Sequence, residues 1–166
     1  MKNKDIIFSK TQIVSLVILR MLIGWHLLYE GIAKLLMQNW SSVGFLSESQ
    51  WVMSGIAKWI ISHDLVLAIV DIVNIWGLIA IGVSLILGIF SKSASLAGAF
   101  LLFIYFLNNA PIIGIEFSVP SEGNYLIINK TLIESAALFV LYFFPTSCNV
   151  GLDFYLKKVS IFKNRI

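Results

Sequence analysis

Four ionisable side chains interrupt a long apolar stretch near the start of the sequence. They are Arg20, His26, Glu30 and Lys34, and all lie in the run from Ile13 to Met37. An ionisable group in hydrocarbon costs roughly 2.5–3.5 kcal/mol on insertion scales, so a membrane helix seldom keeps four without partners or a use for them. At 3.6 residues per turn the four fall within an arc of about 120°, with Trp25 and Tyr29 on the other side. One face of the predicted helix is therefore polar and is not expected to contact lipid.

More polar residues are predicted at the depth of Glu30 and Lys34. If successive apolar runs cross a bilayer in alternate directions, a rise of about 1.5 Å per residue places polar residues of three later helices at a similar level. These residues are Asp71, Asn74, Asn108, Asn109, Asn129, Lys130 and Glu134. Arg20 lies roughly 15 Å from Glu30 along the axis of the first helix. Polar side chains of separate helices are thus expected to converge in one half of the bundle.

Two interpretations of this convergence remain open. In the first, the charges form a buried ion-pair lattice that holds the helices together, since Glu30 four residues before Lys34 is the favourable order for a pair. In the second, they surround a water-accessible or ligand-filled pocket that opens to the outer face, because ionisable groups at membrane depth often mark such sites.

The second interpretation assigns roles to particular residues. The candidate catalytic residues are Glu30, Lys34, Glu134 and His26. His26 can exchange protons near neutral pH, or it can be a core histidine whose hydrogen bonds are made within the protein. The candidate substrate-binding residues are Arg20, Asp71, Asn74 and Lys130. Metal binding is not predicted, because His26 and His63 are far apart and no metal-ligand motif accompanies them.

The composition predicts an integral membrane protein. Of its 166 residues, 58% are hydrophobic and only 13% are charged, which is outside the range of soluble globular domains. Four runs approach or exceed the roughly 20 apolar residues that span a bilayer. They are Ile13–Met37, Leu65–Phe90, Ala94–Ala110 and Tyr125–Phe144. The expected fold is an all-α bundle of four transmembrane helices, formed by residues 1–166 as a single domain.

The lysine distribution predicts the orientation of these spans. Positive residues concentrate in the N-terminal tail, in the connection at Lys92 and in the C-terminal tail. By the positive-inside rule both termini and the Lys92 connection are cytoplasmic, in a bacterial or archaeal cytoplasmic (inner) membrane. The net charge of +3 reflects this topology, so the expected partner is the lipid bilayer and no nucleic-acid partner is predicted.

The connections between the spans carry further predictions. Residues 48–61 have helical periodicity with Trp51 and Trp59, which predicts an amphipathic helix on the outer surface or over the bundle, although a packed loop helix fits equally well. Residues 91–93 are predicted to form a tight turn, with Gly82 and Gly98 allowing the second and third helices to approach closely. Residues 111–124 are predicted to be an extended loop.

The order of several short motifs resembles the DoxX/DoxD family of four-helix membrane proteins. The first run contains LRMLIG at 19–24 and YEGIAKL at 29–35, similar to the family's opening LR…G…G..KL pattern. The stretch from Gly77 to Gly98, with Leu87-Gly88 and Ser91-Lys92, is similar to its G…LLLG..tr segment. Gly151-Leu152-Asp153 is similar to its closing motif, whereas Asp71 and Asn74 stand in the region where many members place a glutamate.

This resemblance implies a subunit of a membrane redox system. Such a subunit takes part in the oxidation of thiosulfate or another sulfur compound with quinone as the acceptor. Cys148 is the only cysteine, so the chain has no cysteine pair for redox chemistry. It is expected to borrow a cofactor, to bind quinone itself or to depend on a partner redox subunit. Two alternatives remain: a non-catalytic membrane partner or assembly factor for a redox protein, and, ranked lower, a small transporter.

Overall fold

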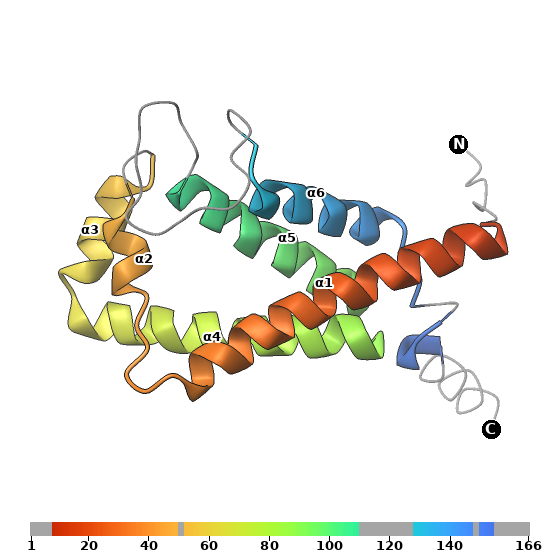
Figure 1. Cartoon of the computed structure of the whole chain (residues 1–166), viewed down its shortest axis with the longest axis horizontal. Coiled ribbons are helices and arrows are strands. Elements are labelled where there is room, and N and C mark those ends of the chain that lie inside the picture. Colours follow the sequence, from red (N-terminus) through yellow and green to blue (C-terminus); the bar gives the residue numbers. More distant parts are fainter. Residues whose placement is uncertain (1–7, 50–51, 110–127, 148–149, 155–166) are drawn as a thin grey trace, which may run out of the picture.

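The computed structural model describes residues 8–49, 52–109, 128–147 and 150–154, and within them the chain is helical with no β-strands. Figure 1 shows the helices in order. They are α1 (Lys10–Leu36), α2 (Val43–Ser47), α3 (Ser54–Ile61), α4 (Asp64–Leu87), α5 (Ser91–Asn108) and α6 (Lys130–Phe143). The predicted loop at 111–124 and the Cys148 position lie outside the described residues.

Three of the described helices, α1, α4 and α5, are long and apolar enough to cross a membrane, which indicates a membrane protein. The fourth predicted run is helical over 14 residues in α6, a length of about 21 Å at 1.5 Å per residue. The start of α6 is fixed locally, because the side chain of Asn129 accepts a hydrogen bond from the backbone N–H of Leu132.

The turn between α4 and α5 lies earlier than the sequence suggested. Gly88 (φ 67°) and Phe90 (φ 48°) both adopt the left-handed conformation, and Ser91 already begins α5. The prediction of a turn at residues 91–93 is therefore wrong. A left-handed residue ends a helix, and glycine is the residue that adopts this conformation without steric cost.

The four longer helices pack as two pairs, α1 with α4 and α5 with α6, and α4 with α5 joins the pairs. Glycines set the spacing of α1 and α4. A Cβ atom at Gly82 would lie only 2.6 Å from the backbone nitrogen of Leu28 on α1. Gly82 was expected to face α5, but it faces α1 and allows the backbones of α1 and α4 to approach closely. Gly98 on α5 lies against Leu138 of α6, where an added Cβ atom would be 2.9 Å from a side-chain carbon.

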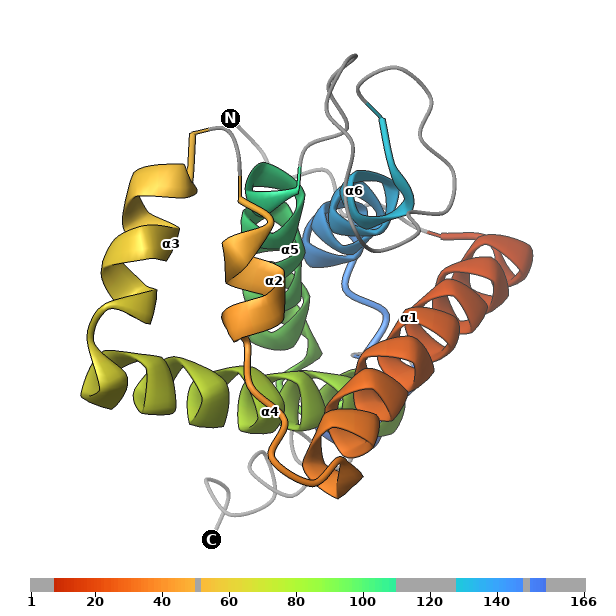
Figure 2. The same cartoon turned by 60° about the vertical axis from the view of Figure 1, so that its left-hand side comes forward.

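The short helices α2 and α3 lie across one end of this bundle, and α3 runs roughly perpendicular to α4 (Figures 1 and 2). The predicted helix in the segment 48–61 is confirmed from Ser54 to Ile61. Its N-terminal boundary was placed too early, since Glu48 is the C-terminal cap of α2, a helix that was not predicted. Ala57 of α3 is buried, while Ile56 and Trp59 are exposed, as expected for an amphipathic helix at an apolar interface.

Candidate functional site

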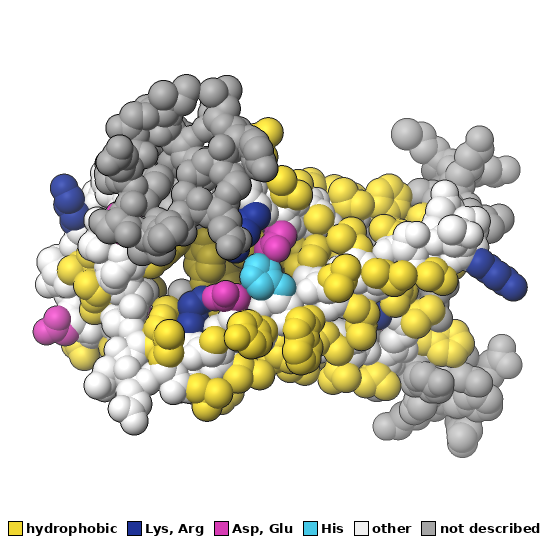
Figure 3. Space-filling view, in the orientation of Figure 1, with side chains coloured by type: hydrophobic (Ala, Val, Ile, Leu, Met, Phe, Trp, Pro, Cys, Tyr) yellow, Lys and Arg dark blue, Asp and Glu magenta, His cyan; other side chains and the backbone are white. Residues whose placement is uncertain are grey.

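A cavity of about 150 Å³ lies between the two helix pairs. Its lining comes from all four long helices: His26, Leu27, Glu30, Lys34, Leu78, Leu102, Tyr105, Lys130, Thr131 and Glu134. Figure 3 shows this place as a hollow, where a histidine lies among acidic and basic side chains next to a largely apolar surface. The cavity therefore combines leucine walls with a concentrated set of ionisable groups.

His26 and Glu134 form a bridge from α1 to α6 at the edge of the cavity. The His26 Nδ1 atom lies 2.9 Å from Oε1 and 3.0 Å from Oε2 of Glu134. Both side chains are partly accessible, with 34% of His26 and 27% of Glu134 exposed. The next residue, Ser135, donates a hydrogen bond of 2.8 Å to the carbonyl of Ala99, which fixes α6 against α5. The bridge thus joins α1 to a helix, α6, that is fixed against α5.

Glu30 and Lys34 form a second pair, one helical turn further along α1. The Lys34 Nζ atom donates to Glu30 Oε2 at 3.1 Å. The lysine side chain is only 17% exposed, whereas 46% of the glutamate is exposed. Lys34 Nζ also lies 5.6 Å from the ring centre of Trp40 and 5.8 Å from that of Tyr105, within the range of cation–π attraction. The Lys34 ammonium is thus stabilised by the Glu30 carboxylate and by two aromatic rings.

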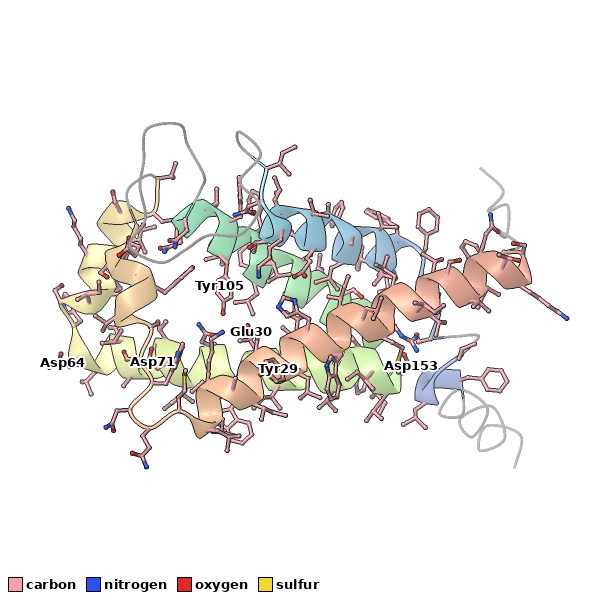
Figure 4. The ribbon with its side chains drawn as sticks, in the orientation of Figure 1. Tyr29, Glu30, Asp64, Asp71, Tyr105 and Asp153 are labelled. Atoms are coloured by element: carbon pink, nitrogen blue, oxygen red, sulfur yellow. The ribbon has the colours of Figure 1, made fainter. Side chains whose placement is uncertain are left out.

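Tyr105 is a site residue that the sequence analysis did not identify. Its hydroxyl donates a hydrogen bond of 2.6 Å to Asn74 Oδ1 on α4. Figure 4 shows Tyr105 on α5 and Glu30 on α1 at the same level of the bundle. The signal in the sequence was its position one helical turn before Asn108, which placed it at the depth of the polar cluster. Asn74 does not line the cavity, and its contact is with the Tyr105 hydroxyl.

Asp71 joins α4 to the segment before α2 and does not line the cavity. Its Oδ1 atom accepts hydrogen bonds from the backbone N–H of Ser42, at 2.9 Å, and from the Ser42 hydroxyl. The neighbouring helix α2 is fixed to α5, because Asn108 Nδ2 donates to the carbonyl of Phe45 at 2.8 Å. The ring of Phe45 packs against Tyr105, with ring centres 5.2 Å apart. Helix α2 is therefore tied down beside the cavity residue Tyr105, at this end of the bundle.

Arg20 lies at a different site, near the opposite end of α1. Its side chain is 3% exposed, and it donates to Thr146 Oγ1 at 3.1 Å and to the carbonyl of Val150 at 3.0 Å. Asp153 attracts the guanidinium electrostatically, while its carboxylate accepts a hydrogen bond of 3.0 Å from the backbone N–H of Phe90. The backbone of Gly88 packs against Gly151, where an added Cβ atom would meet a Cα atom at 2.8 Å.

The structure thus brings together five of the eight predicted site residues. His26, Glu30, Lys34, Lys130 and Glu134 line one cavity. Asp71 and Asn74 support its surroundings from α4, and Arg20 joins α1 to the segment after α6. The described part of the chain contains no group of three histidine, cysteine or carboxylate side chains placed to hold a metal ion. The cavity groups can exchange protons and stabilise a developing negative charge on a bound molecule.

Comparison with known proteins finds no match for this chain among protein-family models, curated proteins or solved structures.

Proposed function

We propose that this protein is a DoxX/DoxD-type membrane subunit of a redox system, and that its cavity binds the head group of a quinone. The observation that carries the proposal is the combination of size and lining. A cavity of about 150 Å³ matches one that accommodates a benzene-sized ring. Leu27, Leu78 and Leu102 offer apolar walls for such a ring, while the ionisable groups offer partners for its oxygens.

When bound, a quinone accepts two electrons and two protons and becomes the quinol. The electrons would come from a partner redox subunit that oxidises a reduced sulfur compound such as thiosulfate. The residues of this chain manage protons and charge. His26 and Glu134, whose side chains approach to 2.9 Å, would donate protons to the bound ring. Lys34 places a positive charge beside Tyr105.

A second region supports the family assignment. The motifs that resemble the DoxX/DoxD family lie far apart in the sequence, yet Arg20, Gly88 and Asp153 meet at one end of the bundle. The backbone N–H of Asp153 donates to the carbonyl of Gly88 at 3.0 Å, and the Arg20 guanidinium lies within 3.3 Å of the position of an added Gly88 Cβ atom. A shared structural role explains why these motifs occur together in one chain.

The test of the proposed function is quinone binding by the purified full-length protein. Extraction of the purified sample should release quinone, and a tail-less quinone such as duroquinone should bind and quench tryptophan fluorescence. The Thr131→Trp variant, which fills the cavity, should lose this binding. Co-purification of a soluble redox protein without any quinone binding would favour the alternative, a non-catalytic membrane partner or assembly factor.

We also propose four membrane spans, formed by α1, α4, α5 and α6, with both termini and the α4–α5 turn cytoplasmic. In a Cys148→Ser background, Lys92→Cys on α5 should react with a membrane-impermeant maleimide only in inverted vesicles. Lys58→Cys on α3 should react only in intact cells, because α3 then lies on the outer side. Both positions are exposed, so accessibility does not limit either reaction. Reaction of Lys92→Cys in intact cells would reverse the orientation.

A double-variant cycle separates the binding role of Glu30 and Lys34 from a purely structural one. Glu30→Gln should lower the free energy of unfolding, because it leaves the largely buried Lys34 without its 3.1 Å carboxylate partner. The double variant Glu30→Gln/Lys34→Met should recover most of that loss. Quinone binding should stay weak in the double variant if Lys34 stabilises the ligand. Recovery of binding together with stability would remove this pair from the site.

A further inference from the structure

We infer that the cavity opens sideways into the lipid, through a seam between α1 and α6, and that its ligand is a lipid-phase molecule with a ring-sized polar head and a long apolar tail. This inference rests on the proposed function and adds the route by which the ligand arrives. It also excludes a water-soluble sulfur anion as the occupant of this cavity. Three features of the described residues carry it.

The first feature is the uneven packing of the helices. The extensive contacts are within the pairs α1–α4 and α5–α6, whereas α1 and α6 share limited contact. In Figure 1, α1 runs obliquely, so that its N-terminal part lies near the end of α6 and its C-terminal end lies near α4. Phe8 and Phe144 pack edge to face where the two helices meet, with ring centres 5.9 Å apart. From there α1 and α6 diverge toward the level of the cavity (Figure 1).

The second feature is exposed charge beside apolar surface. His26, Glu134 and Glu30 are all partly exposed. Figure 3 shows a histidine and acidic side chains beside apolar surface on a lateral face of the molecule. His26 is 10 residues from the end of α1 at Leu36, which is about 15 Å along the axis and near the middle of a hydrocarbon core about 30 Å thick. The side chain of Leu22, one helical turn before His26, is 64% exposed. An opening at this depth, bordered by exposed apolar side chains, faces the acyl chains of the lipid.

The third feature is the closed end of the bundle. Ser42 donates a hydrogen bond to Asp71, and the carbonyl of Phe45 accepts one from Asn108. The Phe45 ring packs against the ring of Tyr105. These contacts join α2 to both α4 and α5 next to the cavity. The described contacts at the seam are fewer: the partly exposed His26–Glu134 bridge lies at the cavity, and Phe8 packs against Phe144 where the two helices meet.

These features together define the ligand. A head of about one ring fits the cavity between the leucine walls, and a tail longer than the cavity must leave through the seam. The tail then lies along exposed apolar residues, Leu22 on α1 and Ile133 on α6. An isoprenoid-tailed quinone has this form. The His26–Glu134 bridge lies at the edge of the opening, where it contacts the polar head as the tail remains in lipid.

Photolabelling in lipid nanodiscs tests the route. The full-length protein is incubated with a quinone analogue that carries a diazirine at the far end of an isoprenoid tail, irradiated, digested and mapped by mass spectrometry. We expect labels on the α1 and α6 residues that border the seam, at Leu22 or Ile133. Excess untagged long-tailed quinone should reduce this labelling at least tenfold, because one site binds both molecules.

Two variants on α6 provide the controls. Thr131→Trp fills the cavity and should reduce the seam labels at least tenfold, whereas Phe139→Trp, at a position 50% exposed and outside the cavity, should leave them unchanged. Seam labels that persist in Thr131→Trp would arise from collisions in the bilayer and would overturn the inference. Labels on α2 or α3, with duroquinone still bound, would overturn the lateral route and leave the proposed function intact. Failure of duroquinone to bind the protein without substitutions would overturn both the lateral route and the proposed function.

Discussion

Replacing Arg20 with methionine should lower the free energy of unfolding by about 3–5 kcal/mol, because the charged hydrogen bonds of a buried guanidinium are lost together. Arg20 is 3% exposed, and its two hydrogen bonds reach Thr146 and Val150, more than 120 residues along the chain. Methionine has a similar length but no donor, so the Thr146 hydroxyl and the Val150 carbonyl lose a partner. For a chain of this size the loss corresponds to a decrease in Tm of about 6–20 °C.

Lys10→Met is the matched control for this change. It removes a cation of the same helix, but Lys10 is exposed, so we expect an effect within about 0.5 kcal/mol. Arg20→Lys should give an intermediate loss, because one ammonium group does not reproduce the two-pronged geometry of the guanidinium. Thermal unfolding in detergent, followed by circular dichroism, measures all three variants. Equal Tm values for Arg20→Met and Lys10→Met would show that the Arg20 contacts contribute nothing to stability.

The helices of this protein were largely predictable, because hydrophobic run length encodes them directly. The apolar runs located α1, α4 and α5 to within a few residues at most boundaries. The errors occur where backbone conformation or tertiary contact decides. The α4–α5 turn depends on left-handed Gly88 and Phe90, and a left-handed phenylalanine has no sequence signature. Helix α2 is only five residues long, which is too short for its sequence to show a helical periodicity.

The site was predictable in part, because depth can be estimated from a sequence but direction cannot. Depth placed Glu30, Lys34, Lys130 and Glu134 at one level, and all four line the cavity. Depth also selected Asp71, which instead faces Ser42 in the connection before α2. That partner is not part of a predicted span, so no helical wheel could identify the contact. The role of Arg20 was likewise not predictable, because its partners lie far along the sequence, after α6.

The partnership of His26 and Glu134 is the feature on which the proposed chemistry depends most. Glutamine at either position keeps a polar side chain of similar size but removes a group that can accept and donate a proton. His26→Gln and Glu134→Gln should each lower the rate of quinone reduction by about 10²–10⁴-fold, the usual contribution of a positioned acid or base. Because both side chains are partly exposed, the Tm should change far less than in Arg20→Met. The measurement is quinone reduction with the reconstituted partner, beside thermal unfolding and duroquinone binding of each variant.

The controls separate proton transfer from binding and from folding. Trp25→Phe changes the residue next to His26 on the exposed side of α1, where 64% of the tryptophan is accessible, and should leave the rate unchanged. The double variant His26→Gln/Glu134→Gln should be about as slow as either single variant, because the two groups act as one unit whose loss is not additive. If instead the two losses multiply, the groups act independently. Full turnover in both single variants, with duroquinone still bound, would show that protons reach the cavity through Glu30 or Lys34 and that the His26–Glu134 bridge only joins α1 to α6.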